Sequence, residues 1–439
     1  MLDIQRCPDA EAPATGKLAA VLNRKAGFPS EIVDAAAEIL RRVQAEGDAA
    51  VAGYTEKFDG VVLPPGGFRV PRKALDDARA AMDRELEEAV CEAAANIRSF
   101  HRRQLRGSWF LEDGDGVVLG KRVLPLRRGG LCVPGGQTPL LSTLLMTAVP
   151  AQVAGVDEIC VVTPPRPGGL PHPVILATAA MLNLDEVYAI GGAQAVAALA
   201  FGTQTIAAVD KIAGPGGPYT VAAKQQVYGR VGIDTVAGPS EIVVLADENA
   251  DPRCVAADLL AQAEHGSGFE AAVCITPSEA LAAKVQAEAE NQLATLPRRR
   301  EIAAALKNFG LVVVVPDLEA GARLVDRIAP EHVELLVADP WRWLGEIRNA
   351  GAVFLGEASS EPVGDYFAGA NHVLPTNGAA RFSSALGVDD FVRSTSVLGY
   401  SGQRLRRTGE KIARMARAEE LEAHARAIEA RLEDCGREG

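Results

Sequence analysis

The chain has 439 residues, more than one simple hydrophobic core usually organises, so at least two domains are expected. Apolar residues make up 48% of it and charged residues 23%, an ordinary globular composition, and no apolar run reaches the roughly 18 residues that a membrane span needs. The net charge of −12 argues against nucleic acid as a partner.

The first residues, M-L-D-I-Q-R-C-P-D-A-E, contain no apolar run behind a basic patch, so no secretory signal is expected. The seven cysteines are scattered through the chain without any C-x-x-C pair. This distribution suits a reducing compartment and argues against both a disulfide framework and a cysteine-ligated metal. We therefore expect a cytoplasmic protein.

Amphipathic helices are predicted over residues 31–58 and 73–106, ahead of a region that alternates between short β-branched runs and longer helical patterns. The apolar runs are continuous rather than alternating, as in strands that are covered on both faces. The predicted strands span residues 130–134, 158–163, 186–190, 241–247, 272–276, 311–315 and 352–356. Helical segments such as 140–155 separate them, which is typical of parallel β-α-β units, so we predict an α/β fold.

Several strands end in glycine-rich turns, at residues 133–136, 190–195 and 212–219. In open α/β sheets, ligands lie at the carboxyl ends of the strands, and glycine lets the main chain approach them closely. The G-x-G-x-x-G fingerprint of dinucleotide-binding sites is missing from the sequence. The turns are therefore interpreted either as ligand contacts or as simple ends of strands.

A first Glu-His dipeptide lies near the end of a predicted helix over residues 251–266, which begins with Asp251 and Pro252 and stops at a glycine. Gln262 and His265 are three residues apart and project from one face of this helix. Histidine with a second nitrogen or oxygen ligand at this spacing is compatible with zinc. The alternative is that His265 only caps the C-terminal end of the helix, where the helix dipole favours it.

The second Glu-His dipeptide, Glu331 and His332, follows Pro330 at the entry to a strand. Neighbouring side chains of an extended chain point to opposite sides, so the two groups are not expected to hydrogen-bond to each other. Both can still flank a substrate, where the glutamate would act as a base toward water and the histidine would accept a proton. The alternative is a pair of surface residues in a loop.

Residues 364–384 are dense in glycine, asparagine, threonine and serine, which predicts a long polar loop, and such loops in compact enzymes are usually functional. Asp365 is a candidate oxygen ligand for a divalent metal, and His372 is a candidate hydrogen-bonding residue near it. His101 and His172 lie in basic and proline-rich surroundings, so both are expected at the surface.

The C-terminal tail, residues 403–434, is rich in alanine, arginine, glutamate and leucine, which predicts one long helix or two short ones. His424 lies there, five residues after Glu419. Five residues at about 100° each place the two side chains about 140° apart, so an unbroken helix would not aim both at one point. The tail is expected to pack on a neighbouring part of the chain or on a partner subunit.

A set of motifs occurs together and in order along the chain. The motifs are A-G-P-S-E-I (237–242), A-Q-A-E-H-G (261–266), A-P-E-H-V-E (329–334), G-D-Y with N-H-V-L-P-T-N-G (364–378), R-F-S-S (381–384) and E-E-L-E-A-H (419–424). As a set they strongly resemble the histidinol dehydrogenase family, from about residue 30 to the tail, and the fragments at 191–203 and 209–216 agree with it. The resemblance implies a zinc enzyme that oxidises L-histidinol, through L-histidinal, to L-histidine with two NAD+, the last step of histidine biosynthesis.

The resemblance also implies the roles of the site residues. Glu331 would activate water against the aldehyde, and His332 would act as the general base in the hydride steps. The implied zinc ligands, whose nitrogen and oxygen donors suit that ion, are Gln262, His265, Asp365 and His424. The implied substrate contacts are Ser240, Gln262, His265, His332, Asp365, Glu419 and His424. In the family, the zinc holds the imidazole and amino groups of the substrate rather than activating the water.

The NAD contacts of the family fall on Cys132, Gln194 and Gly217, and two of the three depart from the family residue. The family usually has tyrosine where this chain has Cys132 and asparagine where it has Gly217, whereas Gln194 is retained. A lost ring and a lost amide are expected to weaken or reshape nucleotide binding without touching the zinc and substrate residues.

The family forms homodimers with exchanged tails, so the resemblance implies that Glu419 and His424 enter the site of the partner subunit. It also implies two incomplete Rossmann-like parallel-sheet domains and a helical tail. The expected parts are an N-terminal arm (1–25), a first domain with the zinc and catalytic residues (26–130 and 242–385), a second domain with the glycine-rich turns (131–241) and the tail (386–439).

Two other functions stay open at this point. The first is a sister dehydrogenase of the same fold that acts on another small amino- or sulfo-alcohol, which the changed turns at Cys132 and Gly217 allow. The second is a non-catalytic ligand-binding protein on this scaffold, against which the intact Glu331 and His332 argue.

Overall fold

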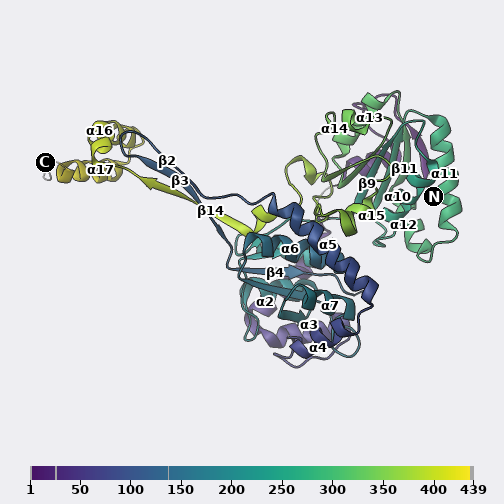
Figure 1. Cartoon of the computed structure of the whole chain (residues 1–439), viewed down its shortest axis with the longest axis horizontal. Helices are drawn as coiled ribbons and strands as arrows, with labels where there is room; N and C mark the ends of the chain where they lie inside the picture. Colours follow the sequence, from purple (N-terminus) through teal and green to yellow (C-terminus); the bar gives the residue numbers. More distant parts are fainter. Residues whose placement is uncertain (1, 25–26, 137, 436–439) are drawn as a thin grey trace. The chain divides into compact units, whose positions relative to one another are not determined.

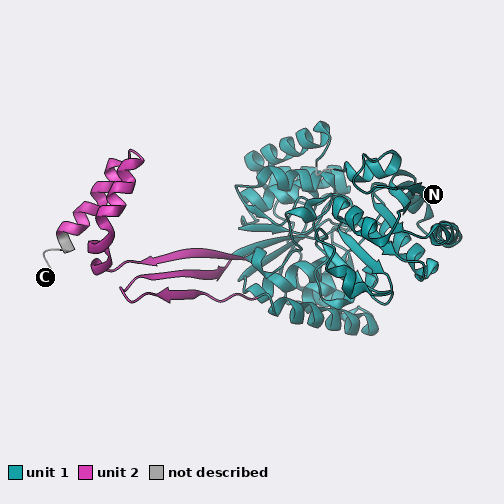
Figure 2. Ribbon diagram, turned by 90° about the horizontal axis from the view of Figure 1, so that it is seen from above, with its two compact units in different colours: residues 1–104, 126–391 teal, residues 105–125, 392–439 magenta. Residues whose placement is uncertain are grey.

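The structure is a computed structural model that describes residues 2–24, 27–136 and 138–435. The chain divides into two compact units, shown in different colours in Figure 2. The first unit contains residues 1–104 and 126–391, and the second contains residues 105–125 and 392–439. The sheets of the first unit are parallel, whereas that of the second unit is antiparallel.

A six-stranded sheet in the order β1-β11-β10-β9-β12-β13 forms one part of the first unit (Figure 1). Its strands are β1 (Asp3–Arg6), β9 (Glu241–Ala246), β10 (Ala271–Thr276), β11 (Gly310–Val314), β12 (His332–Leu336) and β13 (Ala352–Leu355). The helices packed on it are α1 (Gly16–Leu22), α10 (Pro252–Ala263), α11 (Glu279–Leu293), α12 (Arg299–Phe309), α13 (Leu318–Ile328) and α14 (Pro340–Leu344).

Alternate residues of the central strands enter two different cores. Val244 of β9 packs with α10, α11 and α12, whereas Val243 and Leu245 pack with α1 and α13 on the other face. Successive side chains of a strand point to opposite faces, so a strand that is covered twice has to be apolar throughout. This burial explains the continuous apolar runs and confirms the predicted α/β class.

A five-stranded parallel sheet in the order β6-β5-β4-β7-β8 forms the other part of the first unit. Its strands are β4 (Arg128–Cys132), β5 (Glu158–Thr163), β6 (Glu186–Ala189), β7 (Lys211–Ala213) and β8 (Gly232–Ile233). The helices that follow its strands are α6 (Leu141–Ala154), α7 (Pro173–Met181), α8 (Gly192–Phe201) and α9 (Pro218–Val227). Two incomplete parallel sheets are therefore present, as predicted.

The N-terminal helices pack with the five-stranded sheet. They are α2 (Ser30–Glu46), α3 (Asp48–Asp59), α4 (Arg72–Ala80) and α5 (Arg84–Arg102). Helix α2 contacts α8 and α9, α4 contacts α7, and α5 contacts α6. The segment before α4 also bonds to β6, because Val70 donates its N–H to Val187 and Phe68 accepts that of Ala189. Residues 36–70 therefore share a core with residues 132–231, whereas α5 contacts both α6 and the short helix η1 (Gly364–Ala368).

The second unit combines an antiparallel sheet with two helices. The sheet has the order β14-β3-β2, formed by β2 (Trp109–Glu112), β3 (Val118–Pro125) and β14 (Val392–Gly399). The helices are α16 (Gly402–Ala418) and α17 (Glu422–Cys435). Glu420 has a φ of 61°, which interrupts the helical conformation between them, so the tail forms two helices rather than one.

Short helical segments complete the first unit. They are α15 (Glu361–Val363), the π-helix η1 (Gly364–Ala368) and the 3-10 helices η2 (Ala379–Arg381) and η3 (Val388–Phe391). Within the described residues, no helix combines the length and the apolar character that crossing a membrane would require.

Candidate active site

The candidate catalytic residues lie at the amino-terminal edge of the six-stranded sheet. Ser240 directly precedes β9, Glu331 directly precedes β12, and His332 is the first residue of β12. Parallel pairing sets His332 beside Ile242 of β9 and Ala352 of β13. The A-G-P-S-E-I and A-P-E-H-V-E motifs, far apart in the sequence, therefore meet at this edge.

Helix α10 carries Gln262 and His265 back to the same edge, because it returns across the sheet from the end of β9. Its start is fixed by Asp251, whose Oδ1 accepts the N–H of Arg253 at 2.8 Å. Gln262 is fully buried in the last turn, and His265 follows in the turn where Gly266 has a φ of 87°. The helix predicted between the aspartate and the glycine is confirmed.

The main chain of Glu241 holds both residues of the second Glu-His dipeptide. Oε2 of Glu331 accepts the N–H of Glu241 at 3.0 Å. Nδ1 of His332 lies 3.1 Å from the carbonyl oxygen of Glu241 and 3.0 Å from Oε1 of Gln262. Oxygen acceptors around Nδ1 place the imidazole proton on that nitrogen, which leaves a lone pair on Nε2. Nε2 has no hydrogen-bond partner among the described residues, so it can accept a proton.

Burial sets the protonation of this pair. It raises the pKa of Glu331 well above its ordinary value, and the carboxylates of Glu241 and Asp365 add to the rise. Burial lowers the pKa of His332, which keeps the ring neutral and able to act as a base. Oε2 of Glu331 and Nδ1 of His332 lie 3.8 Å apart, too far for a hydrogen bond, as expected for neighbours on an extended chain.

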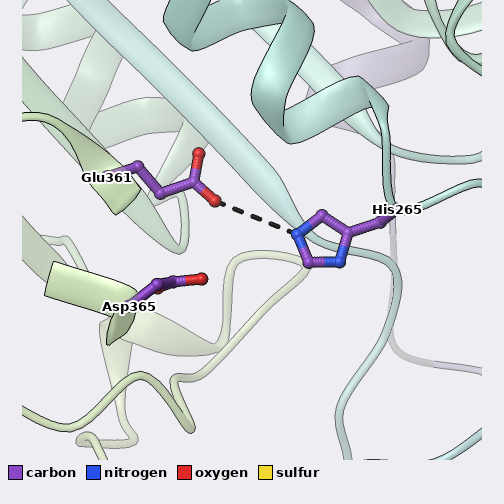
Figure 3. A group of neighbouring side chains, drawn as sticks. All are labelled: His265, Glu361 and Asp365. Carbon is purple, nitrogen blue, oxygen red and sulfur yellow. Dashed lines mark ion pairs between the residues drawn. The ribbon is translucent and has the colours of Figure 1, made fainter. Parts of the chain in front are cut away.

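Three further donors gather at this edge, as Figure 3 shows: the ring of His265 and the carboxylates of Glu361 and Asp365. Their ligand atoms all lie within 4.8 Å of one another, and Nε2 of His265 lies 3.9 Å from Oε1 of Glu361. Asp365 belongs to η1, and its Oδ1 lies 3.8 Å from Nε2 of His332. The donor group and the catalytic pair therefore share one site.

The two carboxylates of the donor group concentrate negative charge beside His265, whose side chain is partly exposed whereas that of Glu361 is buried. Burial raises the pKa of Asp365 to about 7, the Glu361 carboxylate adds to that rise, and His265 opposes it. Burial alone would lower the pKa of His265, but Glu361 and Asp365 outweigh it and the pKa is raised. A divalent cation between these groups would relieve the repulsion of the two carboxylates.

The donor chemistry fits zinc. Nitrogen and oxygen ligands suit this ion, and the predicted ligands Gln262, His265 and Asp365 all come to this edge. Nε2 of Gln262 and Oε2 of Glu361 are buried without a hydrogen-bond partner among the described residues. Buried polar atoms are normally paired, so such exceptions are typical of a site that binds a ligand.

Glu361 is a site residue that the sequence did not single out. It is 3% exposed and opens α15, four residues before Asp365. Residues four apart lie on one face of a helix, so the two carboxylates point the same way. This spacing is the signal that would have revealed Glu361.

Glu419 and His424 lie in the second unit, where both are exposed. Glu419 follows the last residue of α16, and His424 lies in the first turn of α17. The break at Glu420 removes the 140° separation that an unbroken helix would impose on them. The donor group described above consists of residues of the first unit, and these two belong to the other.

The expected cofactor residues lie at the carboxyl edge of the five-stranded sheet. Cys132 ends β4, Gln194 lies in the first turn of α8, and Gly217 directly precedes α9. Burial raises the pKa of Cys132 to about 12, so its thiol stays neutral. Oε1 of Gln194 is buried without a hydrogen-bond partner among the described residues, and a Cβ at Gly217 would meet no atom within 4 Å. A buried amide oxygen without a partner is compatible with a bound ligand.

The predictions for two other histidines, His101 and His372, compare differently with the structure. The prediction that His101 lies at the surface is wrong, because it is fully buried and its Nδ1 lies 2.7 Å from Oε1 of Gln104. His372 lies near Asp365 as a hydrogen-bonding residue, since its Nδ1 is 3.1 Å from the carbonyl oxygen of Asp365. Burial lowers the pKa of His372 to about 4, so this ring is neutral.

Comparisons with known proteins agree on one family. The family model for histidinol dehydrogenase matches residues 22–432. A histidinol dehydrogenase of Geobacillus kaustophilus is 53% identical over 396 residues, which cover 90% of this chain and 93% of the relative. That of Chlorobaculum tepidum is 48% identical and covers 98% of this chain and 99% of the relative. The crystal structure of a histidinol dehydrogenase from Elizabethkingia anophelis matches with a TM-score of 0.91 at 36% identity, over 98% of both chains.

Proposed function

This chain belongs to the histidinol dehydrogenase family, and on that premise we propose that the site at the amino-terminal edge oxidises L-histidinol, through L-histidinal, to L-histidine. As an NAD-dependent oxidoreductase of this family, the chain passes one hydride to NAD+ in each of the two oxidations. The reaction removes four electrons from one carbon and adds the oxygen of one water molecule.

The observation that carries the proposal is the pair of contacts from the main chain of Glu241 to Glu331 and His332. They fix a carboxylate and a neutral imidazole side by side next to the donors His265 and Asp365. An alcohol oxidation followed by an aldehyde oxidation needs a base for each hydroxyl proton and a base for water.

In the first oxidation, Nε2 of His332 takes the hydroxyl proton of the alcohol while hydride leaves the same carbon for the nicotinamide ring. Water then adds to the aldehyde carbon, and the Glu331 carboxylate takes the proton that the water loses. His332 returns its proton to the aldehyde oxygen as the water adds, so it is neutral again and takes a hydroxyl proton when the hydrated aldehyde loses its second hydride and becomes the acid. NAD+, when bound, would supply the acceptor for both hydrides.

Gln262, His265 and Asp365 would hold the zinc ion, together with His424 from a tail. When bound, the ion supplies an anchor for the imidazole and amino groups of the substrate, which directs the alcohol carbon toward His332. Ser240 and Glu419 are proposed as further substrate contacts. Ser240 lies directly before Glu241, within reach of the same edge.

Gln194 is proposed to contact NAD, with the turns at Cys132 and Gly217 beside it. The smaller side chains at these two positions remove a ring and an amide that the family uses. We expect weaker or altered nucleotide binding for this reason, with the zinc and substrate residues unaffected.

The active protein is proposed to be a cytoplasmic homodimer with exchanged tails, so that Glu419 and His424 of each chain serve the site of the other. Support comes from the tail itself: Glu419 and His424 are exposed polar residues of a separate unit.

The test is the amount of NADH formed per L-histidinol consumed by the purified, zinc-loaded protein. We expect two NADH per substrate, lost on chelation and restored by added zinc. Absence of turnover with L-histidinol, despite bound zinc and NAD+, would overturn the substrate assignment. The sister dehydrogenase would then be tested with other small amino- and sulfo-alcohols.

A further inference from the structure

The backbone of Glu241 that holds the catalytic pair is itself held from the N-terminal arm. The Glu241 side chain is 3% exposed, and its Oε1 lies 3.3 Å from Nη1 of Arg24. Arg24 lies just after α1, more than two hundred residues earlier in the sequence. An ion pair this deeply buried requires good geometry, because both charges have lost their water.

Arg24 also binds the main chain of two segments, one before β9 and one before β10. Its Nη2 donates to the carbonyl oxygen of Pro239 at 3.3 Å and to that of Phe269 at 2.6 Å. Its guanidinium lies over the ring of Phe309, 5.0 Å from the centroid. The planar fork of donors thus ties the segment before β9 to the segment before β10.

The catalytic pair depends on this segment for its orientation. Among the described residues, the N–H of Glu241 is the one hydrogen-bond donor found for the Glu331 carboxylate. The carbonyl of the same residue sets the tautomer of His332. A shift of Glu241 would therefore move the water-activating carboxylate and the base together, and a displacement of about 1 Å can cost a large factor in rate.

We propose that Arg24 is a positioning residue: through its ion pair with Glu241, it holds Glu331 and His332 in place for proton transfer. The proposal rests on the roles assigned above to Glu331 and His332. Among the described residues, the contacts of Arg24 do not include the donor group, so its effect is on the rate of the proton-transfer steps rather than on zinc or on substrate affinity.

The test compares Arg24→Met, Arg24→Lys and, as a matched control, Arg6→Met. Arg6 is another cation of the same arm, but it is exposed and pairs with Glu279 at the surface. The readouts are zinc per subunit, the KM for L-histidinol, and kcat measured separately with L-histidinol and with L-histidinal.

For Arg24→Met, we expect kcat to fall by about tenfold or more in the L-histidinal step, with KM and zinc content close to the parent values. Arg24→Lys keeps the charge and should recover a large part of that loss. Arg6→Met should match the parent protein in all readouts. Glu241→Gln, which keeps the main-chain contacts but removes the ion pair, should show the same loss of kcat, and combining it with Arg24→Met should add little.

Parent rates in Arg24→Met would overturn the proposal. So would a loss that Arg24→Lys fails to recover and that comes with reduced zinc content, because that pattern belongs to general destabilisation. If Arg24→Met does not fold, the kcat of Glu241→Gln tests the proposal on its own. If Glu331→Gln oxidises L-histidinal at the parent rate, the role assigned to Glu331 is wrong. This outcome concerns the proposed function and is distinct from a failure of the Arg24 proposal.

Discussion

At the scale of single residues, the site depends on contacts that fix protons. His332 keeps its proton on Nδ1 because the carbonyl of Glu241 and the amide of Gln262 face that nitrogen. Glu331 is buried and receives one main-chain N–H, so it holds a proton more tightly than an exposed glutamate does. A base of this kind, once ionised, is a stronger proton acceptor than an ordinary carboxylate.

We expect Glu331→Gln to halt the reaction at the aldehyde. The amide oxygen still accepts the N–H of Glu241, so the fold is retained, but an amide cannot take a proton from water. The L-histidinal step should slow by about 100-fold or more, and the NADH formed per L-histidinol should fall from two toward one. Zinc content serves as the control. Two NADH at the parent rate would show that another group activates the water.

A second carboxyl cluster lies behind the donor group. Oε1 of Glu334 accepts the N–H of Glu361 at 2.7 Å, and its Oε2 is buried without a hydrogen-bond partner among the described residues, near Asp258 of α10. Burial, followed by the charge of Asp258, raises the pKa of Glu334, which therefore stays protonated in the folded chain above the pH at which it ionises in the unfolded chain. Unfolding then releases a proton.

The parent protein should therefore lose stability as the pH rises. The contribution of Glu334 is fully present below its ordinary pKa of 4.5 and is lost as the pH climbs toward the raised value. Glu334→Gln mimics the protonated form, so its thermal midpoint should fall less than that of the parent between about pH 6 and pH 9. The exposed Glu290→Gln is the control and should follow the parent. Identical profiles for the parent and Glu334→Gln would contradict a raised pKa.

Single residues were predictable where a local pattern carried the information. Gln262 and His265 follow from helix spacing, and Glu331 with His332 stand out as a dipeptide after proline. His101 was misplaced because one of its partners is distant in the sequence: Nδ2 of Asn371 lies 3.3 Å from Nε2 of His101. A contact between residues 270 positions apart leaves no trace in the local composition.

At the scale of elements, burial decides what the sequence reveals. The central strands β9, β10 and β12 are buried on both faces, so their apolar runs are continuous and visible. The strands β2, β3 and β14 are mostly exposed and polar, and no periodic signal marked them. The edge strand β1 is also mostly exposed, so its sequence did not predict a strand either.

The entry of β13 is packed tightly against the catalytic segment. Gly351 donates its N–H to Pro330, and Ala352 donates to the carbonyl of Glu331 at 2.8 Å. A Cβ on Gly351 would lie 2.6 Å from that carbonyl oxygen, closer than side-chain carbons normally approach. Glycine is therefore required here by the neighbouring main chain.

We expect Gly351→Ala to destabilise the protein by about 1–3 kcal/mol and to slow the L-histidinal step, because the added methyl group displaces Glu331. Urea unfolding and the two-step assay measure these effects. Gly345→Ala is the matched control, since its Cβ would meet the nearest atom, the carbonyl oxygen of Arg342, at an ordinary 3.5 Å. Equal stability of the two variants would show that β13 can shift to accommodate the added methyl group without a loss of stability.

At the scale of the whole molecule, the chain consists of two units, and the make-up of the second was only partly predictable from the sequence. The helical character of the tail was predicted, whereas its attachment to residues 105–125 was not. Strand β3 pairs with β14 over its full length, from Val118 opposite Gly399 to Pro125 opposite Val392. Long-range pairing of two polar strands has no local signature, so the composition of the second unit could not be read from either segment alone.

The exchange of tails predicts complementation between inactive variants. His332→Asn lacks the base, and His424→Asn lacks a proposed zinc ligand. If each tail serves the other subunit, a mixed dimer holds one site in which both residues are intact. Mixing the two variants after unfolding and refolding them together should restore up to about a quarter of the parent activity, because half of the dimers are mixed and half of their sites are complete.

Each variant refolded alone is the control and should stay inactive. Mixed dimers that are verified by a different affinity tag on each variant and still lack activity would show that every chain uses its own tail.

The pairing of β3 with β14 also constrains the order in which the protein is made. About 270 residues separate Pro125 from Val392, and a ribosome adding about 5–20 residues per second needs tens of seconds to reach β14. During that interval the hairpin of β2 and β3 presents an unpaired edge together with the apolar side chains of Trp109, Phe110 and Leu111. The second unit therefore forms only after β14 has been made, and until then the exposed edge of β3 is open to neighbouring chains.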